Sequence, residues 1–367
     1  MSASRLRVLA LAPYPQAAPS TRVRITQFVP GLDSAGIDVH LHPFLDDTGY
    51  ASARRGRGAL GALAGASLRM VRVLEGLSGY DLVWIQRGAA PGLDTLVARA
   101  LANAGTPYVF DFDDAVYLPQ EGGRPWVEAV RRPGPSTRAF CQGATLVLAG
   151  SEHLAGYARR VVGRAAGNRV RVLPSVVDTM LLQPGPPRVQ EVPVLGWVGT
   201  DTTVPYLESL APSLAALARE TRYRLVVVTG ARRPRIPGVE LDVLEWSLEG
   251  ELEALQAMDV GLYPLDDTPW SRGKCGFKAL QYLACGVPCV ASPVGVLPGI
   301  VVPGRTGLLA SSQADWVAAC RSLLSDAPLR RTLGAQGREL VRASFSLDAA
   351  LPMLVQAFDD AVSQRHA

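Results

Sequence analysis

The chain has 367 residues, of which 48% are hydrophobic and 19% are charged, and its formal net charge is +4. This length allows two domains of roughly 150 residues each. The mild positive charge comes without runs of lysine and arginine, which argues against a nucleic-acid-binding protein. The five cysteines form no CxxC pair and no zinc spacing, so we expect buried thiols in a reducing compartment.

The chain shows no signal-peptide pattern and no apolar run of the roughly 18 residues that a membrane span needs. We therefore expect a cytoplasmic protein. Residues 59–77 form an amphipathic stretch, with arginines on or near it at Arg54, Arg55, Arg57, Arg69 and Arg72. Such a helix either covers a sheet or lies on an acidic membrane surface, so a peripheral contact with the inner face of the membrane is the alternative.

Short apolar runs alternate with longer amphipathic stretches, which predicts parallel sheets covered by helices. The first half contains six predicted strands, at residues 6–12, 38–44, 81–86, 108–112, 145–149 and 170–173. The second half contains six more, at residues 194–198, 224–229, 240–244, 260–263, 287–291 and 307–310. Six predicted strands in each half predict an α/β protein with two doubly wound parallel-sheet domains that face each other across a cleft.

The domain boundaries follow from composition. The proline-rich segment 174–193 has no periodicity and is predicted to link a domain of residues 1–175 to one of residues 192–345. The last segment, 346–367, is predicted to contain a helix that could pack back on the N-terminal domain. In open α/β sheets, ligands bind beyond the carboxyl ends of the strands, so polar side chains that follow strands are the candidate site residues.

In the first half, three carboxylates lie at the end of the strand at 108–112: Asp111, Asp113 and Asp114. They could take or hold a proton, and Asp114 could instead cap the next helix. Asp111 and Asp113 also form an Asp-x-Asp element, but alone it is a weak metal signal, so we expect no metal. Arg22 and Arg24 lie in the first turns of the first predicted helix, and Arg87 ends a strand. These three arginines could bind a diphosphate or an acidic acceptor, or form ordinary salt bridges.

In the second half, residues 272–295 (RGKCGFKALQYLACGVPCVASPVG) predict a turn, a helix at about 276–285, a buried strand and a glycine turn. Lys274 lies just before the helix and Lys278 lies one turn into it. Both ammonium groups can therefore reach the helix N-terminus, where unpaired amides and the helix dipole favour an anion. A diphosphate suits this arrangement, and a packing unit with solvated lysines is the alternative. Arg272 could join the site or face solvent, and Gly295 could admit phosphates or simply form a turn.

The segment GKCGFKALQYLACGVPCVASPVG, followed by PGRTGLL at 303–309, resembles the donor-binding region of glycosyltransferase family 4. That region commonly reads E-x7-E-A-x-x-x-G-x-P-V-V-A, then a glycine turn and a G-x-T-G-x-L element. Further segments are similar to one subgroup, from about residue 5 to residue 346: STRVRITQFVPGLDSAGI, YVFDFDDAVY, AGSEHLAGYAR, LPSVVDT and LGWVGTDTTVPYLESLAPSL. The resemblance implies the GT-B fold, with two Rossmann-like domains of which the second holds most of the nucleotide sugar. It also implies retention of anomeric configuration, with no cofactor or metal required.

The family's two glutamates are replaced here. Gln281 stands in the place of the second glutamate, which is implied to hold the ribose, and could still form hydrogen bonds without a charge. Gly273 stands in the place of the first, which helps to orient the donor sugar, and cannot do so. Lys274 and Lys278 thus become the expected phosphate ligands, together with the helix start at Gly276 and Phe277.

The family's arginine and lysine after the first strand of the second domain are also absent. That turn contains Gly199, Thr200, Thr202 and Thr203, whose hydroxyl and amide groups could bind phosphate oxygens. At the place where the family lodges the nucleobase, Trp246 could stack on the base and Glu245 could accept a hydrogen bond, although packing explains a tryptophan equally well.

We therefore predict a glycosyltransferase that moves a sugar from a nucleotide-diphosphate sugar to an unknown acceptor, in polysaccharide, glycolipid or natural-product glycosylation. Asp113 falls where many family members carry a histidine that contacts the donor sugar. With Asp111 and Lys278 it forms the predicted catalytic set. One alternative is a sugar-nucleotide-binding protein of the same fold that has lost catalysis, and another is a sugar-nucleotide epimerase.

Overall fold

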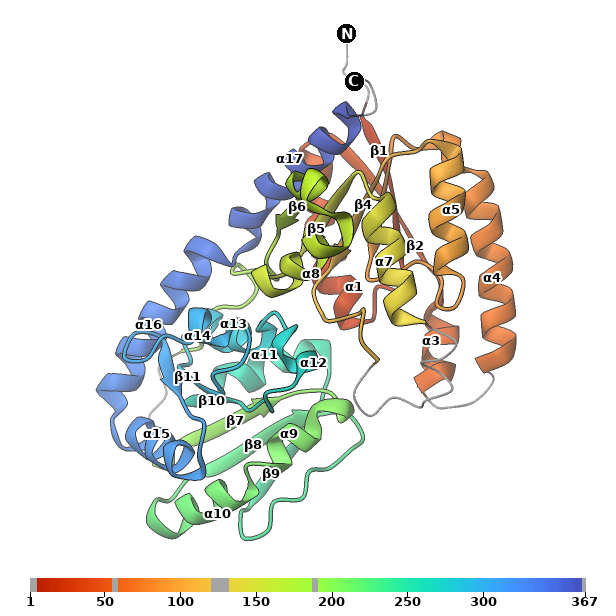
Figure 1. Ribbon diagram of the computed structural model, residues 1–367. Helices are drawn as coiled ribbons and strands as arrows, with labels where there is room; N and C mark the ends of the chain where they lie inside the picture. The colour runs from red at the N-terminus through yellow and green to blue at the C-terminus, as the bar shows by residue number, and fades with distance from the viewer. Residues whose placement is uncertain (1–4, 55–58, 120–131, 187–190, 365–367) are drawn as a thin grey trace. The chain divides into compact units, whose positions relative to one another are not determined.

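The computed structural model describes residues 5–54, 59–119, 132–186 and 191–364 (Figure 1). The chain forms two compact units: residues 1–175 with 350–367 make the first, and residues 176–349 make the second. The described residues of the segment 174–193 that follow Ser175 thus group with the second unit. Each unit is built on one sheet of six strands, which confirms the six-plus-six prediction.

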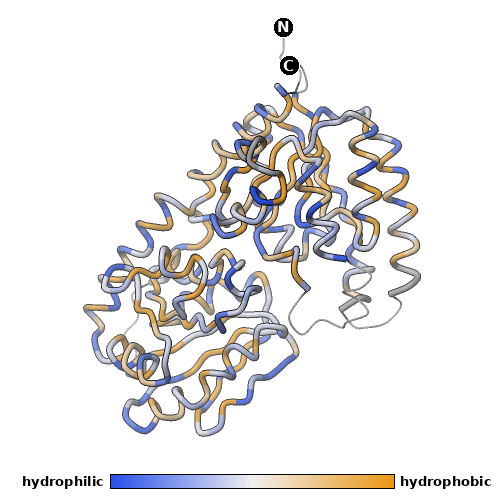
Figure 2. The backbone as a smooth tube through the Cα atoms, in the orientation of Figure 1, coloured by the Kyte–Doolittle hydropathy of each residue, from blue (hydrophilic) through white to orange (hydrophobic). Residues whose placement is uncertain are grey.

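The first unit has the strand order β2-β1-β3-β4-β5-β6, and all neighbouring strands are parallel. Its strands are β1 (Leu6–Ala12), β2 (Ile37–Pro43), β3 (Leu82–Gln86), β4 (Tyr108–Phe112), β5 (Leu146–Ala149) and β6 (Val170–Val172). The central strands β3, β4 and β5 are buried along their whole length, as is typical of a parallel sheet with both faces covered. Figure 2 shows the corresponding hydrophobic stretches inside the unit.

The helices of the first unit are α1 (Pro19–Arg24), α2 (Val29–Ser34), α3 (Asp47–Arg54), α4 (Ala59–Glu75), α5 (Asp94–Ala104), α7 (Pro133–Gly143), α8 (Glu152–Val162) and most of α17 (Leu347–Ser363). Helices α4, α5 and α7 lie side by side (Figure 1). Helix α17 packs on the sheet through Phe358, whose ring lies 5.2 Å from that of Trp84. It also contacts α2, where a side chain at Gly31 would collide with Leu351.

The second unit has the strand order β12-β11-β10-β7-β8-β9, again all parallel. Its strands are β7 (Val194–Val198), β8 (Arg224–Thr229), β9 (Leu241–Glu245), β10 (Val260–Tyr263), β11 (Cys289–Ala291) and β12 (Gly307–Leu309). In both units, every strand lies within one or two residues of its predicted range. Alternate residues face opposite sides, so Val194 and Val198 join one core cluster while Leu195 and Trp197 join the other.

The helices of the second unit are α9 (Val204–Glu208), α10 (Ala211–Glu220), α11 (Leu248–Gln256), α12 (Pro269–Arg272), α13 (Phe277–Ala284), α14 (Leu297–Ile300), α15 (Gln313–Ser325) and α16 (Ala327–Ser344). A short 3-10 helix at Asp201–Thr203 directly precedes α9. Helices α11, α13 and α14 supply residues to one core cluster, and α9, α10 and α15 supply residues to the other. The sheet is therefore sandwiched, as the continuous apolar runs of its strands predict.

Each sheet has a topological switch point, where the chain order reverses. In the first sheet it lies between β1 and β3, and in the second between β7 and β10. Open α/β sheets bind ligands at the carboxyl ends of the strands on either side of such a point. We therefore expect the site residues at these two strand edges.

Helix α4 is apolar on its outer face as well as its inner face. Leu68 and Val71 are 68% and 53% exposed, while Ala66 and Met70 on the other side are buried. Arg55 and Arg57 of the basic cluster lie outside the described residues. Among the residues that the structure describes, no helix combines the length and the hydropathy that crossing a bilayer requires.

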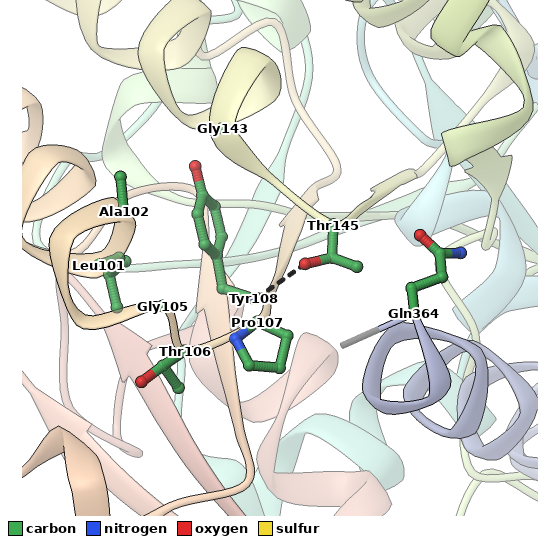
Figure 3. A pocket seen from close by; sticks show the side chains of 9 residues that line it. All are labelled: Leu101, Ala102, Gly105, Thr106, Pro107, Tyr108, Gly143, Thr145 and Gln364. Atoms are coloured by element: carbon green, nitrogen blue, oxygen red, sulfur yellow. Dashed lines mark hydrogen bonds between the residues drawn. The ribbon is translucent and has the colours of Figure 1, made fainter. Parts of the chain in front are cut away.

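A cavity of about 230 Å³ opens at the amino end of β4, lined by Leu101, Ala102, Gly105, Thr106, Pro107, Tyr108, Gly143, Thr145 and Gln364 (Figure 3). Tyr108 closes one side, since its hydroxyl donates to the carbonyl of Phe140 at 2.9 Å. This cavity lies at the opposite edge of the sheet from the switch point. It is therefore not part of the candidate site.

Candidate functional site

In the second unit, the turn after β7 forms one side of the switch point. A side chain at Gly199 would lie within 2.2 Å of the Trp197 ring, so only glycine allows the turn to pack against this tryptophan. The Thr203 hydroxyl donates to the Thr200 carbonyl at 2.9 Å, and the hydroxyls of Thr200 and Thr202 lie 3.0 Å apart. The predicted turn residues thus form one hydroxyl-rich loop at the carboxyl end of β7.

Helix α13 is fixed to this edge of the sheet by Tyr282. Its hydroxyl accepts from the backbone N–H of Val198 at 2.9 Å and lies 3.3 Å from the carbonyl of Leu262. A side chain at Gly261 would collide with the Tyr282 ring, so the glycine lets α13 approach β10 closely. Burial raises the pKa of Tyr282 well above its ordinary value, which keeps the hydroxyl protonated. The helix start is thereby held beside the ends of β7 and β10.

The start of α13 has the geometry predicted for an anion site. Gly276 precedes the helix with φ +75°, and a side chain there would also meet Ile300 at 2.5 Å. No side chain caps the helix, and among the described residues the first-turn amides at 277–279 donate to no recorded acceptor. Such amides and the positive end of the helix dipole favour a bound anion.

Lys278 points its ammonium group into this edge. Its Nζ donates to the Thr203 hydroxyl at 3.2 Å and lies 4.4 Å from the centre of the Trp197 ring and 5.5 Å from that of Tyr263. Burial, together with the charge of Lys274, lowers the pKa of Lys278 well below its ordinary value.

Neither lysine forms an ion pair with a carboxylate in the described part of the chain. Lys274 instead lies with its Nζ 5.9 Å from the Trp270 ring. Lysine and arginine together number 37 in the sequence, and Lys274 and Lys278 are its two lysines. The chain therefore concentrates its side-chain amines at one strand edge, where no carboxylate of the described residues pairs with them.

The other residues predicted to bind the donor divide into two groups. Gly295, with φ +59°, packs directly on the carbonyl of Arg272, so the two glycine turns lie together. Arg272 itself forms a two-pronged ion pair with Asp267, at 2.6 and 2.9 Å, and is half exposed. Gly273 is buried between these turns, and Phe277 is half-buried against the core.

Three predicted contacts with the nucleoside receive less support from the geometry. Gln281 is only 5% exposed, because α13 is covered on all sides along its second half. The indole N–H of Trp246 donates to Glu251 at 2.9 Å, and its ring packs against the core. Glu245 is exposed at the end of the edge strand β9, two strands from β7.

In the first unit, the geometry does not support the predicted roles of Arg24 and Asp111. Both side chains are buried, at 1% and 0% exposure, and Arg24 donates to Asp111 at 2.5 and 3.3 Å. Arg24 also donates to two backbone carbonyls, and Trp84 donates to Asp111. Burial raises the pKa of Asp111 although Arg24 opposes this shift. This pair braces the sheet and is closed to a substrate, while Arg22 is half-buried on the same helix.

Arg87 instead joins Asp113 and Asp114. Its guanidinium donates to Asp113 at 2.7 Å and to Asp114 at 2.5 Å. Arg87 has φ +61°, a left-handed conformation that is strained for a non-glycine residue. The following turn is held by the buried Asp94, which accepts from the N–H groups of Ala89 and Ala90.

The ionisation of this group is fixed by its pairing. Burial alone would raise the pKa of Asp113, but Arg87 and Arg24 outweigh it and hold that pKa below its ordinary value. Burial alone would likewise lower the pKa of Arg87, but the two aspartates raise it. Asp113 is therefore a paired carboxylate and a poor proton acceptor. Among the described residues, no group of three or more potential metal ligands is found.

Several residues at these edges were missed by sequence reasoning: Trp197, Tyr263, Trp84, Gln86 and Asp94. Trp197, Tyr263 and Gln86 lie at or next to the carboxyl ends of strands that flank a switch point, so this position alone could have singled them out.

Sequence comparison supplies independent information on the second unit. Residues 192–326, which include the whole lysine-bearing edge, match the family model described as "Glycosyl transferases group 1". A D-inositol 3-phosphate glycosyltransferase from Stackebrandtia nassauensis is 31% identical over 55% of this chain and 51% of its own length. The chain thus spans about half of that relative. An alpha-maltose-1-phosphate synthase from Mycolicibacterium smegmatis is 26% identical over 88% of this chain and 91% of its own.

Solved structures match the whole chain. Sucrose-phosphate synthase from Thermosynechococcus elongatus aligns with a TM-score of 0.72 at 18% identity, covering 98% of this chain and 100% of that one. HepE from Anabaena, solved in complex with UDP and glucose, aligns with a TM-score of 0.70 at 15% identity, covering 97% and 100%. The fold is therefore that of the GT-B glycosyltransferases, with two Rossmann-like parallel-sheet domains.

Proposed function

We propose that this protein is a glycosyltransferase that takes a sugar from a nucleotide-diphosphate sugar and passes it to an acceptor hydroxyl. The observation that carries this proposal is the pair of lysines at the start of α13, which have no carboxylate partner among the residues that the structure describes and lie inside the segment similar to group 1 glycosyl transferases. A ligand that brings two phosphates supplies the missing counter-charge. The complexes of HepE with UDP and with UDP-glucose support a ligand of this class.

In this proposal the α13 edge holds the leaving diphosphate. Lys278, Lys274 and the first-turn amides of α13 stabilise the negative charge that grows as the bond to the sugar breaks. The Thr203 hydroxyl accepts a hydrogen bond from Lys278 and so holds the ammonium group at this edge, where the lysine can turn to the ligand. Arg272 would have to leave Asp267 to take part, which costs little because both partners are exposed and solvent screens the pair.

The role of Asp113 is to hold a sugar hydroxyl rather than to remove a proton. Arg87 keeps it ionised and lowers its basicity, so it accepts hydrogen bonds well and protons poorly. We therefore assign the transfer step to diphosphate stabilisation and to the positioning of the reactants, with retention of configuration and without a metal. As the bond from the sugar to the diphosphate breaks, the acceptor oxygen bonds to the sugar and its proton passes to the leaving diphosphate. The apolar stripe of α4 is compatible with a peripheral membrane contact, to which we assign no role in the reaction.

A donor screen tests this function against its alternatives. Purified protein is incubated with UDP-, GDP- and dTDP-sugars, each with and without a panel of acceptors, and nucleotide release and sugar identity are followed. A transferase releases nucleotide diphosphate only with an acceptor. A binding protein shows a thermal shift with one donor but no release, and an epimerase converts the donor sugar without any acceptor. Either of these last two results would replace the present proposal.

A further inference from the structure

The backbone turns sharply at Arg87, directly after β3. The N–H of Gly88 donates to the carbonyl of Gln86 at 2.7 Å, and Arg87 between them has φ +61°. A hydrogen bond from residue i+2 back to residue i, around a central residue with positive φ, marks the rare and strained form of the γ-turn. A residue other than glycine keeps such a conformation only where its surroundings enforce it.

Asp94, in the first turn of α5, enforces this turn. Its Oδ1 accepts from the N–H of Ala89 at 2.9 Å and from the N–H of Ala90 at 2.8 Å. Asp94 is buried, and a side chain at Gly88 would lie 3.4 Å from its carboxylate, so the turn is packed closely against it. The two hydrogen bonds to Asp94 therefore hold the chain in the path that strains Arg87.

The turn itself offers no backbone donor to a ligand. The four consecutive N–H groups at 87–90 all donate within the protein, the first of them to the carbonyl of Asp111 at 2.7 Å. Turns that bind anions do so through successive N–H groups that have no partner of their own. The consequence of this strained turn is therefore found in the side chain of Arg87.

The turn directs the guanidinium of Arg87 to the end of β4. A residue that continued β3 would place its side chain on the face of the sheet opposite to Gln86. Arg87 instead leaves the strand and donates to Asp113 at 2.7 Å and to Asp114 at 2.5 Å. Burial alone would raise the pKa of Asp113, and Arg87 together with Arg24 holds it below its ordinary value. The ionisation of Asp113 thus depends on the path of the backbone at Arg87.

We propose that Asp94 is a positioning residue for sugar transfer, because it enforces the left-handed turn that aims Arg87 at Asp113. The inference rests on the proposed function, in which Asp113 holds a sugar hydroxyl. Asp94 itself touches no substrate and acts through Arg87. Without Asp94 the turn relaxes, and the conformation that pairs Arg87 with Asp113 becomes about 5- to 150-fold rarer, the range that strain of this kind sets.

The first test is kinetic, with the donor and acceptor that the donor screen identifies. In Asp94→Ala, kcat/KM should fall about 5- to 150-fold, while the Kd for the free nucleotide diphosphate stays unchanged. Asp94→Asn keeps an accepting oxygen and should recover most of the activity. Equal losses in kcat/KM and in nucleotide affinity, or no loss at all, would overturn the proposal.

Asp315→Ala is the matched control for these variants. Asp315 also lies in the first turn of its helix, α15, and also accepts from two consecutive N–H groups that precede the helix, those of Ser311 and Ser312. Its removal should lower the free energy of unfolding and leave kcat/KM and nucleotide affinity unchanged. If Asp315→Ala and Asp94→Ala reduce kcat/KM alike, the effect is one of general stability and the proposal fails.

A double variant separates positioning from a structural role. Arg87→Met removes the guanidinium that the turn aims. In this background Asp94→Ala should change kcat/KM by less than about twofold, although it still lowers stability, because nothing is left to aim. A purely structural Asp94 predicts the same loss of kcat/KM in both backgrounds, and this result would also overturn the proposal.

The last readout needs no turnover. The paired carboxylate of Asp113 stabilises the fold above the unfolded pKa of about 3.9, and this stabilisation is lost as pH falls through its lower folded pKa. Asp94→Ala should therefore make the free energy of unfolding depend less on pH between 7 and 3. The other charged and titratable groups around the Arg87–Asp113 pair are unchanged in this variant: Arg24, Asp111, Asp114 and Tyr14.

This readout also separates the inference from the proposed function. A weaker pH dependence in Asp94→Ala, in a protein that releases no nucleotide with any acceptor, would uphold the link from Asp94 to Asp113 and remove the proposed function. Sugar transfer by the wild type, with the same pH dependence of unfolding in wild type and Asp94→Ala, would uphold the proposed function and overturn the inference.

Discussion

Replacing Lys278 with methionine tests the diphosphate site most directly. Methionine keeps an unbranched side chain one atom shorter than that of lysine, and it removes the ammonium group that lies over the Trp197 and Tyr263 rings. What is lost is a charge-assisted hydrogen bond to phosphate, worth about 1.5–3 kcal/mol. At about 1.4 kcal/mol per tenfold change, the Kd for the nucleotide diphosphate should rise roughly 10- to 150-fold. Isothermal titration calorimetry measures it directly.

The same variant should not destabilise the free protein. Burial and Lys274 lower the pKa of Lys278 in the folded state, so between that value and the unfolded value of about 10.4 the unfolded chain binds more protons. The free energy of unfolding therefore rises with pH across this interval, and the amine opposes folding below it. Lys278→Met should be at least as stable as the wild type at pH 7, and any advantage should fade towards pH 10. Chemical denaturation at both pH values measures this.

Binding of the diphosphate should also take up protons, because an anion beside Lys278 raises the pKa of its amine. Titrations in buffers of different ionisation enthalpy should show this uptake in the wild type and less of it in Lys278→Met. Arg224→Met, which removes an exposed cation of the second unit, is the matched control for net charge. Equal nucleotide affinity in wild type, Lys278→Met and Arg224→Met would refute the assignment of the site.

Three further predictions concern the framework. Tyr282→Phe leaves the N–H of Val198 without its acceptor and should cost about 1–3 kcal/mol in urea denaturation, and a loss below about 0.5 kcal/mol would mean that this hydroxyl does not anchor α13. Arg24→Ala leaves the buried carboxylate of Asp111 without its ion-pair partner and should cost about 3–5 kcal/mol. Arg272→Ala breaks an exposed pair and should cost far less, and similar losses in the two variants would contradict the assigned burial. Asp113→Asn should lower the free energy of unfolding at pH 7, and by progressively less as the pH falls below about 4, because the paired carboxylate stabilises the fold only while it is ionised. A loss of stability that does not depend on pH would argue against the ion pair.

The sheet architecture could be predicted because it depends on a local pattern. Short apolar runs such as 194–198 and 224–229 are bounded by turn residues, and a strand buried on both faces needs little else. The boundary errors are confined to one or two residues, as at β9, which begins and ends one residue later than predicted. The glycines and lysines of 272–295 also indicated their arrangement, because the helix start fixes where nearby side chains can reach.

The arginines could not be assigned in the same way. Whether Arg24 meets a phosphate or Asp111 depends on a contact between residues 87 positions apart, which no local pattern encodes. Arg87 adopts a left-handed backbone conformation that its own residue type disfavours, and the turn imposing it is fixed by Asp94. Gln281 is polar in sequence yet buried, because the second half of α13 is enclosed by the packing of the second unit.

The placement of Lys274 and Lys278 has a practical consequence for chemical labelling. Reagents that acylate or reductively methylate primary amines will find side-chain targets only here, besides the α-amino group of the chain. A ¹³C-methylated sample would therefore give two lysine resonances, each a direct spectroscopic probe of this strand edge. Coupling the protein to an amine-reactive surface or dye would, for the same reason, attach it through the very place where we expect its substrate.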